Sequence, residues 1–114
     1  MAKFSRAAVQ GSAIRGKCSI PIHTKHHHCP HFLSGGCNGG GNVYIEGKLA
    51  QREGDEVNFS TCQHGGSPGH STEGSGSVFI NGRAAVRIKD EGICGRCGQK
   101  FYVVEGASSV FIGD

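Results

Sequence analysis

The chain has 114 residues with 20 glycines, six cysteines and seven histidines, and its formal net charge is +3. This length suits a single domain with a thin core and excludes two well-buried cores. The basic residues are spread along the sequence, so the chain does not have the concentrated basic stripe of a nucleic-acid-binding protein. No stretch approaches the ~18 apolar residues of a membrane span, and residues 1–17 lack the apolar core of a signal peptide. We therefore expect synthesis in the cytoplasm, where clustered cysteines favour metal binding over disulfides.

The first recognisable element is the second half of a repeat. Residues 7–12 read AAVQGS, and they match AQREGD at residues 50–55 and AVRIKD at residues 85–90. The two later copies each follow a strand and a tight turn, whereas the first copy has no such strand before it. The N-terminal segment therefore starts in the middle of a repeat.

Three segments carry the first half of the repeat. They lie at residues 39–55, 74–90 and 106–114, and each has a valine four positions after a glycine, at Val43, Val78 and Val110. The third copy stops after its first strand. We therefore expect this last strand to pair with the N-terminal segment, which gives three similar β-hairpins around a pseudo-threefold axis.

Each hairpin alternates with a period of two residues, which is typical of a half-buried strand. The valines and isoleucines are expected to face the core, and Tyr44, Phe79 and Phe111 to face the other way. Asn81-Gly82 is a strong type I′ turn signal because both positions tolerate positive φ, and residues 46–47 (Glu-Gly) are a poorer version. No long 3.6-residue apolar period occurs, so the predicted fold is all-β with little or no helix.

Every cysteine and histidine lies in one of three segments interpreted as loops, at residues 17–40, 58–74 and 91–100. If the hairpins are related by a threefold axis, these loops converge at one end of the domain. Thiolate and imidazole groups are the usual zinc ligands, and one or two from each loop would cross-link distant segments. Six cysteines and seven histidines make 13 donors, so a second metal stays open.

The individual donors carry alternative interpretations. Cys94 and Cys97 have the CxxC spacing of a metal knuckle or a redox motif, and the absence of a βαβ pattern favours metal. Cys62 and His64 either bind one metal together or include one residue that only packs. Three roles stay open for Cys18 and Cys37: a small buried hydrophobic residue, a ligand of a second metal site, or a disulfide partner.

No pattern indicates catalysis. The carboxylates nearest to the histidines and cysteines are Glu73, Asp90 and Glu91, which resemble turn or capping residues beside strands. A zinc hydrolase needs a general base close to an open coordination position, and the sequence offers none in an obvious arrangement. We therefore predict that the chain is not an enzyme.

Residues 74–95, GSGSVFINGRAAVRIKDEGICG, resemble the PAAR-repeat family, whose signature combines a Gly-Ser strand, VFING, a Pro-Ala-Ala-Arg segment and Gly-Asp. The resemblance covers essentially the whole chain as three partial repeats, and it weakens toward the N-terminus. The naming tetrapeptide is degraded to RAAVR and KLAQR. In addition, Lys89 precedes Asp90 where the family usually has glycine.

The resemblance implies one small conical PAAR-like domain over residues 1–114. Such a domain caps and sharpens the trimeric β-helical spike of a type VI secretion system or a contractile phage tail. The implied partner is a spike protein of the valine-glycine-repeat type or a phage central spike, with transient contact with the target membrane, no nucleic acid, and room for a non-covalent effector cargo. Assembly at the spike tip would follow synthesis in the cytoplasm.

The resemblance also implies one zinc ion near the apex, held by three histidines and one cysteine. Carried over by position, the candidate ligands are His27, Cys62, His64, His70 and Cys94, with Cys62 and His64 as alternatives in one loop. In the first loop, the neighbours His23, His28 and His31 stay open as replacements for His27.

A second hypothesis is a stand-alone zinc module that recognises a protein partner or nucleic acid. The repeats discriminate between the two, because a solitary zinc module rarely needs three hairpins that close head to tail. The sequence does not distinguish a phage tail from a secretion system, since both use the same cap.

Overall fold

Short strands make up about half of the chain that the computed structural model describes, which is residues 4–17, 32–59, 68–95 and 98–114. None of these residues is helical, and no membrane-spanning helix is found among them. The predicted all-β fold is confirmed. The strands are β1 (Phe4–Arg6), β2 (Ala13–Lys17), β3 (Phe32–Cys37), β4 (Tyr44–Ile45), β5 (Lys48–Leu49), β6 (Glu56–Phe59), β7 (Pro68–Ser71), β8 (Phe79–Ile80), β9 (Arg83–Ala84), β10 (Glu91–Cys94), β11 (Lys100–Val103) and β12 (Phe111–Gly113).

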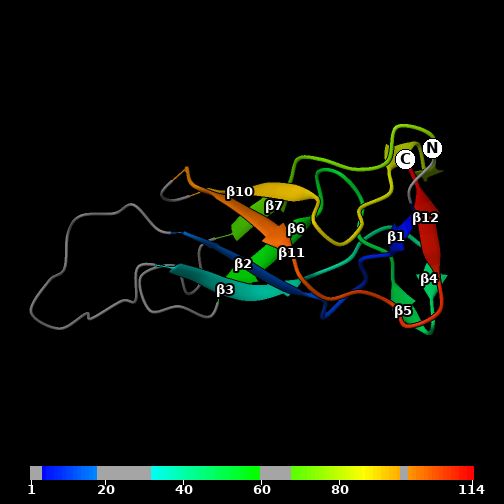
Figure 1. Cartoon of the computed structure of the whole chain (residues 1–114), viewed down its shortest axis with the longest axis horizontal. Coiled ribbons are helices and arrows are strands. Elements are labelled where there is room, and N and C mark those ends of the chain that lie inside the picture. The colour runs from blue at the N-terminus through cyan, green and yellow to red at the C-terminus, as the bar shows by residue number, and fades with distance from the viewer. Residues whose placement is uncertain (1–3, 18–31, 60–67, 96–97) are drawn as a thin grey trace, which may run out of the picture.

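Six strands close a barrel in the order β10-β11-β2-β3-β6-β7, and the other six form three two-stranded ribbons, here called blades. The blades are β4–β5, β8–β9 and β1–β12. The β4–β5 and β8–β9 blades each lie in the chain between a strand that leaves the barrel and a strand that returns to it. In the third blade, β12 follows barrel strand β11, and β1 precedes barrel strand β2. All three blades therefore gather at one end of the barrel (Figure 1). The opposite end, where the barrel strands connect to one another directly, is called the loop end.

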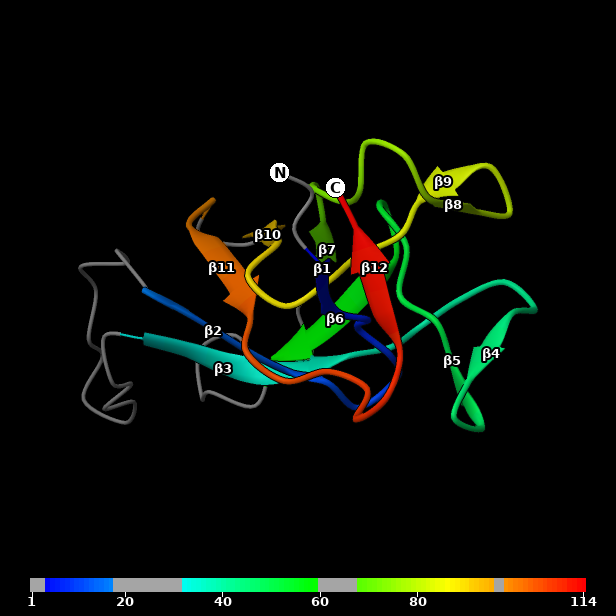
Figure 2. The same cartoon turned by 45° about the vertical axis from the view of Figure 1, so that its right-hand side comes forward.

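The third blade joins the two ends of the chain. β1 and β12 pair antiparallel, with Phe4 opposite Gly113 and Arg6 opposite Phe111. The predicted head-to-tail closure is confirmed. Figure 2 shows β1 beside β12, with the β4–β5 and β8–β9 blades to their right.

The pseudo-threefold axis is visible in the backbone hydrogen bonds below the blades. The Gln51 N–H donates to the Ala8 carbonyl at 2.9 Å, the Val86 N–H to Gln51 at 3.1 Å, and the Ala8 N–H to Val86 at 2.9 Å. These three bonds form a closed ring, one residue from each repeat. Isolated bridges beside the ring repeat the same cyclic order: Val9 with Ala50, Arg52 with Ala85, and Arg87 with Ala7.

The two continuous blades turn as the sequence predicts. Asn81 and Gly82 have φ values of 52° and 79°, and Glu46 and Gly47 have 55° and 78°. Positive φ at both central residues defines the type I′ turn, which matches the twist of the flanking strands. The poorer turn dipeptide Glu46-Gly47 therefore adopts the same geometry as Asn81-Gly82.

The interpretation of three long loops was wrong for much of those segments, because their ends are barrel strands. Their sequences, such as PGHS in β7 and EGIC in β10, have low strand propensity because glycine contributes no side-chain packing. Tertiary packing reverses that preference. A Cβ on Gly92 would lie 2.1 Å from Cζ of Phe101, and one on Gly69 would lie 2.7 Å from Cζ of Phe59. The narrow barrel accommodates Phe59 and Phe101 because the facing strands carry glycine.

Two hydrophobic clusters hold the domain together. The barrel cluster is centred on Phe101 and Phe59, whose rings meet edge to face with centroids 5.8 Å apart. The blade cluster is mostly alanine, with Ile80 and Ile112 from two blades. The predicted inward Val/Ile face is confirmed for these isoleucines, whereas Val78 is 37% exposed.

Candidate functional site

The loop end is where the sequence predicts the metal ligands. β2 and β3 flank residues 18–31, β6 and β7 flank residues 60–67, and β10 and β11 flank residues 95–99. Because neighbouring strands pair in the barrel, these six strand ends lie together at one end of it, away from the blades (Figure 1). The predicted convergence therefore holds for the described residues that flank the histidine- and cysteine-rich segments.

Two of the predicted ligands are in the described part of the chain, and the structure does not bring them together. Cys94 ends β10 opposite Gly69, and His70 in β7 lies opposite Ile93. Side chains alternate between faces along a strand, so Cys94 points into the barrel and His70 points outward. Cys94 is 1% exposed, whereas His70 is exposed. The described residues contain no group of three potential ligands.

The other predicted ligands, His27, Cys62 and His64, lie outside the described residues. The same holds for Cys18, Cys29 and Cys97.

Cys37, which the sequence leaves open between three roles, is a buried member of the barrel cluster. Burial, and to a smaller extent the charge of Asp55, raises the pKa of the Cys37 thiol to about 12. The thiol is therefore protonated at neutral pH, whereas metal binding requires a thiolate. This environment suits a small buried hydrophobe.

The blade end presents a second candidate site made of aromatic side chains. Tyr44, Phe79 and Phe111 occupy the same position in the three repeats and are 64%, 60% and 53% exposed. Each alternates with an isoleucine of its own strand that faces the blade cluster, so these rings lie on the outward faces of the blades. Phe4, 67% exposed, adds a fourth ring on the β1–β12 blade.

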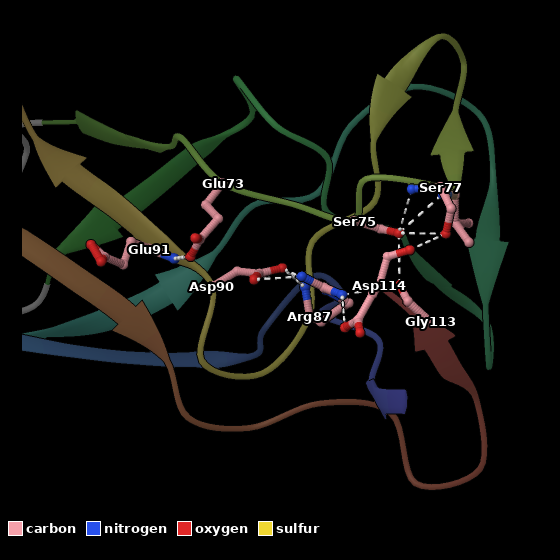
Figure 3. Close-up of polar contacts among 9 residues, drawn as sticks. Glu73, Ser75, Ser77, Arg87, Asp90, Glu91, Gly113 and Asp114 are labelled. Atoms are coloured by element: carbon pink, nitrogen blue, oxygen red, sulfur yellow. Dashed lines mark hydrogen bonds and ion pairs between the residues drawn. The ribbon is translucent and has the colours of Figure 1, made fainter. Parts of the chain in front are cut away.

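Polar contacts, here called blade clamps, join each blade to its neighbour in a cyclic order. The Asn81 amide donates to Asn42 at 2.9 Å, and the Ser109 N–H donates to the Glu46 carboxylate at 2.9 Å. The third contact runs from the Ser75 hydroxyl to the Gly113 carbonyl at 2.7 Å (Figure 3). Glu46 also accepts hydrogen bonds from the hydroxyls of Ser108 and Ser109, and this set lowers its pKa to about 2.

One buried and one partly buried ion pair fix the turns between two of the blades and the barrel. Arg87 donates to both Asp90 oxygens at 2.9 and 3.0 Å, and its second terminal nitrogen reaches the Gly113 carbonyl at 2.9 Å (Figure 3). Arg52 and Asp55 repeat this bidentate geometry at 2.9 and 2.8 Å. These hydrogen bonds to the aspartates raise the pKa of both guanidinium groups. The two aspartates occupy matched positions in the sequence repeats, whereas their pairing with the arginines three positions earlier was not predicted.

Comparison with known proteins places this architecture in a family. The chain is 35% identical over 81 residues to the NAD(P)(+) glycohydrolase toxin Tse6 of Pseudomonas aeruginosa strain PAO1. It matches the (p)ppApp synthetase toxin Tas1 of Pseudomonas aeruginosa strain UCBPP-PA14 to the same extent. Each match takes in 63% of this chain and 17% of the relative, so the chain corresponds to a small part of both toxins. The model of the PAAR motif matches residues 23–99, more than half of the chain, and the chain therefore belongs to the PAAR-motif family.

Proposed function

We propose that this chain is the tip of a contractile injection machine, where it caps the end of a trimeric β-helical spike. The observation that carries the proposal is the repeated aromatic position on the blades, Tyr44, Phe79 and Phe111, in a single chain with internal pseudo-threefold order. A trimeric β-helix ends in three equivalent strand edges, which need covering. One chain of this kind offers one blade to each spike subunit.

The physical basis of docking is burial of apolar surface that the isolated chain exposes. Large aromatic side chains dominate the energetics of interfaces, and fully burying one contributes about 1.5–3 kcal/mol. The blade clamps keep the three rings in fixed relative positions, so little ordering entropy is lost on binding. The role is structural, and no chemical step is assigned to this chain.

A type VI secretion system is the setting we favour over a phage tail. Two relatives are named as toxins, and a toxin needs a delivery route. In this proposal the loop end leads into the target envelope, and the blade end stays on the spike. An effector would travel with the tip, either fused to it or bound without a covalent link.

One zinc ion at the loop end is the second part of the proposal. Cys94 fits such a site, because it is the last residue of β10 at the loop end and its side chain belongs to the barrel cluster. The segments rich in histidine and cysteine follow or precede the strands at this same end. The remaining ligands would come from the candidates His27, Cys62 and His64. His70 fits less well, because its side chain lies on the outer face of the sheet. Bound zinc would cross-link the three segments and oppose their separation under load.

Docking is tested by mixing the chain with the trimeric spike protein of its own organism and measuring the mass of the complex by light scattering. We expect one chain per trimer. Changing Tyr44, Phe79 and Phe111 together to Glu should weaken binding about a hundredfold or more, because three apolar contacts are replaced by charges. The matched control is Tyr102→Glu, which alters an exposed aromatic side chain on the barrel. The proposal would be contradicted if the triple variant bound the spike as tightly as the wild type, or if the wild-type chain formed no complex with the spike.

Zinc is tested by elemental analysis of natively purified protein, with one ion per chain expected. Chelation should lower the unfolding temperature, and Cys94→Ser should abolish that response to the chelator. Cys37→Ser is the control, because Cys37 is also buried in the barrel but lies at the end nearer the blades. A metal-free protein whose unfolding temperature does not change on chelation would exclude the zinc site. That result would not affect the proposal of spike docking.

A further inference from the structure

The third copy of the turn below the blades lacks the ion pair that fixes the other two. Residues 52–55 and 87–90 each begin with arginine and end with aspartate, whereas residues 9–12 begin with valine and end with serine. The backbone is the same in all three. In each copy the first residue's N–H donates to the side chain of the fourth, at 2.8 Å to Asp55, 2.8 Å to Asp90 and 2.9 Å to Ser12.

In the turn of residues 52–55, the carboxylate of Asp55 lies between two cations, and this place is here called the occupied site. Arg52 from the same turn binds it in a bidentate manner, and Arg83 from the next blade approaches it at 3.5 Å. Both Asp55 and Arg52 are buried. The fold therefore has a defined place for a carboxylate at the junction of two blades and the barrel.

The third site keeps a counterpart of one of these two cations, but it has neither the aspartate nor the bidentate arginine. A cavity of about 390 Å³ opens there, and Val9, Ser12 and Lys48 line it. Lys48 follows the turn glycine Gly47 as Arg83 follows Gly82, so it is the counterpart of the cation that approaches Asp55. The lining thus contains the counterpart of Arg83, but it has Val9 in place of Arg52 and Ser12 in place of Asp55.

The charge of the cavity favours an anion. Its ionisable lining residues are two cations, Arg6 and Lys48, and one carboxylate, Glu105. Glu105 accepts a hydrogen bond from the Ala13 N–H at 3.4 Å. Among the described residues, the ion pairs found include neither Arg6 nor Lys48. One positive charge is therefore left for a ligand.

We propose that this cavity binds a carboxylate carried by a protein partner, an aspartate or glutamate side chain that takes the place of the missing aspartate. A polypeptide carboxylate is favoured because the two equivalent sites hold that group. The inference goes beyond spike docking and does not require it, because the cavity belongs to the isolated chain.

The test is a titration of the ¹⁵N-labelled chain with the blocked peptide acetyl-Gly-Asp-Gly-amide, followed by amide chemical shifts. We expect saturable shifts concentrated at Ser12, Lys48 and Glu105, with a dissociation constant in the millimolar range (~1 mM), because the cations are exposed. The matched peptide with Asn in place of Asp should give no saturable shifts. Sodium acetate forms a third arm. Acetate binding as tightly as the peptide would overturn the protein-borne ligand and indicate a small free anion.

Two variants localise the binding. Lys48→Gln should weaken the peptide about two- to fivefold, the range expected for one exposed ion pair, whereas Lys100→Gln on the barrel should leave it unchanged. The double variant Val9→Arg, Ser12→Asp installs the missing pair and should abolish binding. Shifts spread over the surface, or affinity that Lys48→Gln leaves unchanged, would overturn the proposal even if the double variant does not fold.

Discussion

The blades and the barrel are stabilised in different ways, although their strands alternate along the same chain. The blades are held by turns, a ring of three backbone hydrogen bonds and polar clamps around a core of mostly alanine. The barrel is held by two phenylalanine rings packed against strands that carry glycine. The blade end therefore leaves its aromatic rings exposed to solvent, whereas Phe59 and Phe101 are buried inside the barrel. Four perturbations separate these two regions.

The largest expected effect contrasts a barrel ring with a blade ring. Phe101→Ala should lower the free energy of unfolding by about 4 kcal/mol, because a fully buried aromatic ring leaves a cavity that the narrow barrel cannot close. Phe111→Ala, at the exposed blade position, should change it by less than about 0.5 kcal/mol. Urea unfolding of the isolated chain measures both. Similar losses for the two variants would remove the distinction between the regions.

The second test adds one methyl group to a barrel strand. Gly92→Ala should cost about 2–3 kcal/mol, because its Cβ would meet the Phe101 ring at 2.1 Å and the His70 carbonyl at 2.6 Å. Gly76→Ala is the blade control, since no atom lies within 4 Å of the Cβ position there. Denaturant midpoints should separate the two variants clearly. A tolerated Gly92→Ala would mean that the barrel is looser than its glycines indicate.

The third test concerns the turns below the blades. Lys89 has a φ of 78°, where Gly11 and Gly54 occupy the equivalent positions with 90° and 91°. Lys89→Gly should stabilise the chain by about 0.5–1 kcal/mol, because relief of left-handed strain exceeds the added chain entropy. Gly54→Ala should destabilise by a similar amount, and thermal unfolding reports both shifts. A destabilising Lys89→Gly would show that the lysine side chain makes a compensating contact.

The smallest expected effect is a pH dependence of one blade clamp. Hydrogen bonds from Ser109 and Ser108 lower the folded-state pKa of Glu46 to about 2, below its ordinary value in the unfolded chain. The unfolded state therefore takes up the proton first as the pH falls. The contribution of the clamp is complete above the unfolded-state pKa and is lost toward about pH 2. The stability difference between the wild type and Glu46→Gln should shrink over that range, and a constant difference in urea unfolding would contradict the clamp.

The candidate sites differ in how far the sequence could predict them. The outward aromatics follow from two-residue alternation in each copy, so Tyr44, Phe79 and Phe111 were assigned to the correct face. The metal ligands do not follow from any period. His70 and Cys94 lie in segments rich in histidine and cysteine, and only the pairing of β7 with β10 shows that their side chains point to opposite faces.

The sequence by itself determined the repeat, its type I′ turns and the closure of the two chain ends into a third blade. Those features depend on residues that are neighbours in sequence or that recur at matched offsets, so local chemistry specifies them. The barrel was decided only by tertiary structure. Its glycine strands have weak local preference, and they form because Phe59 and Phe101 need facing positions without side chains. The cavity beside Ser12 also depends on tertiary structure, because its lining residues come from segments that are far apart in the sequence.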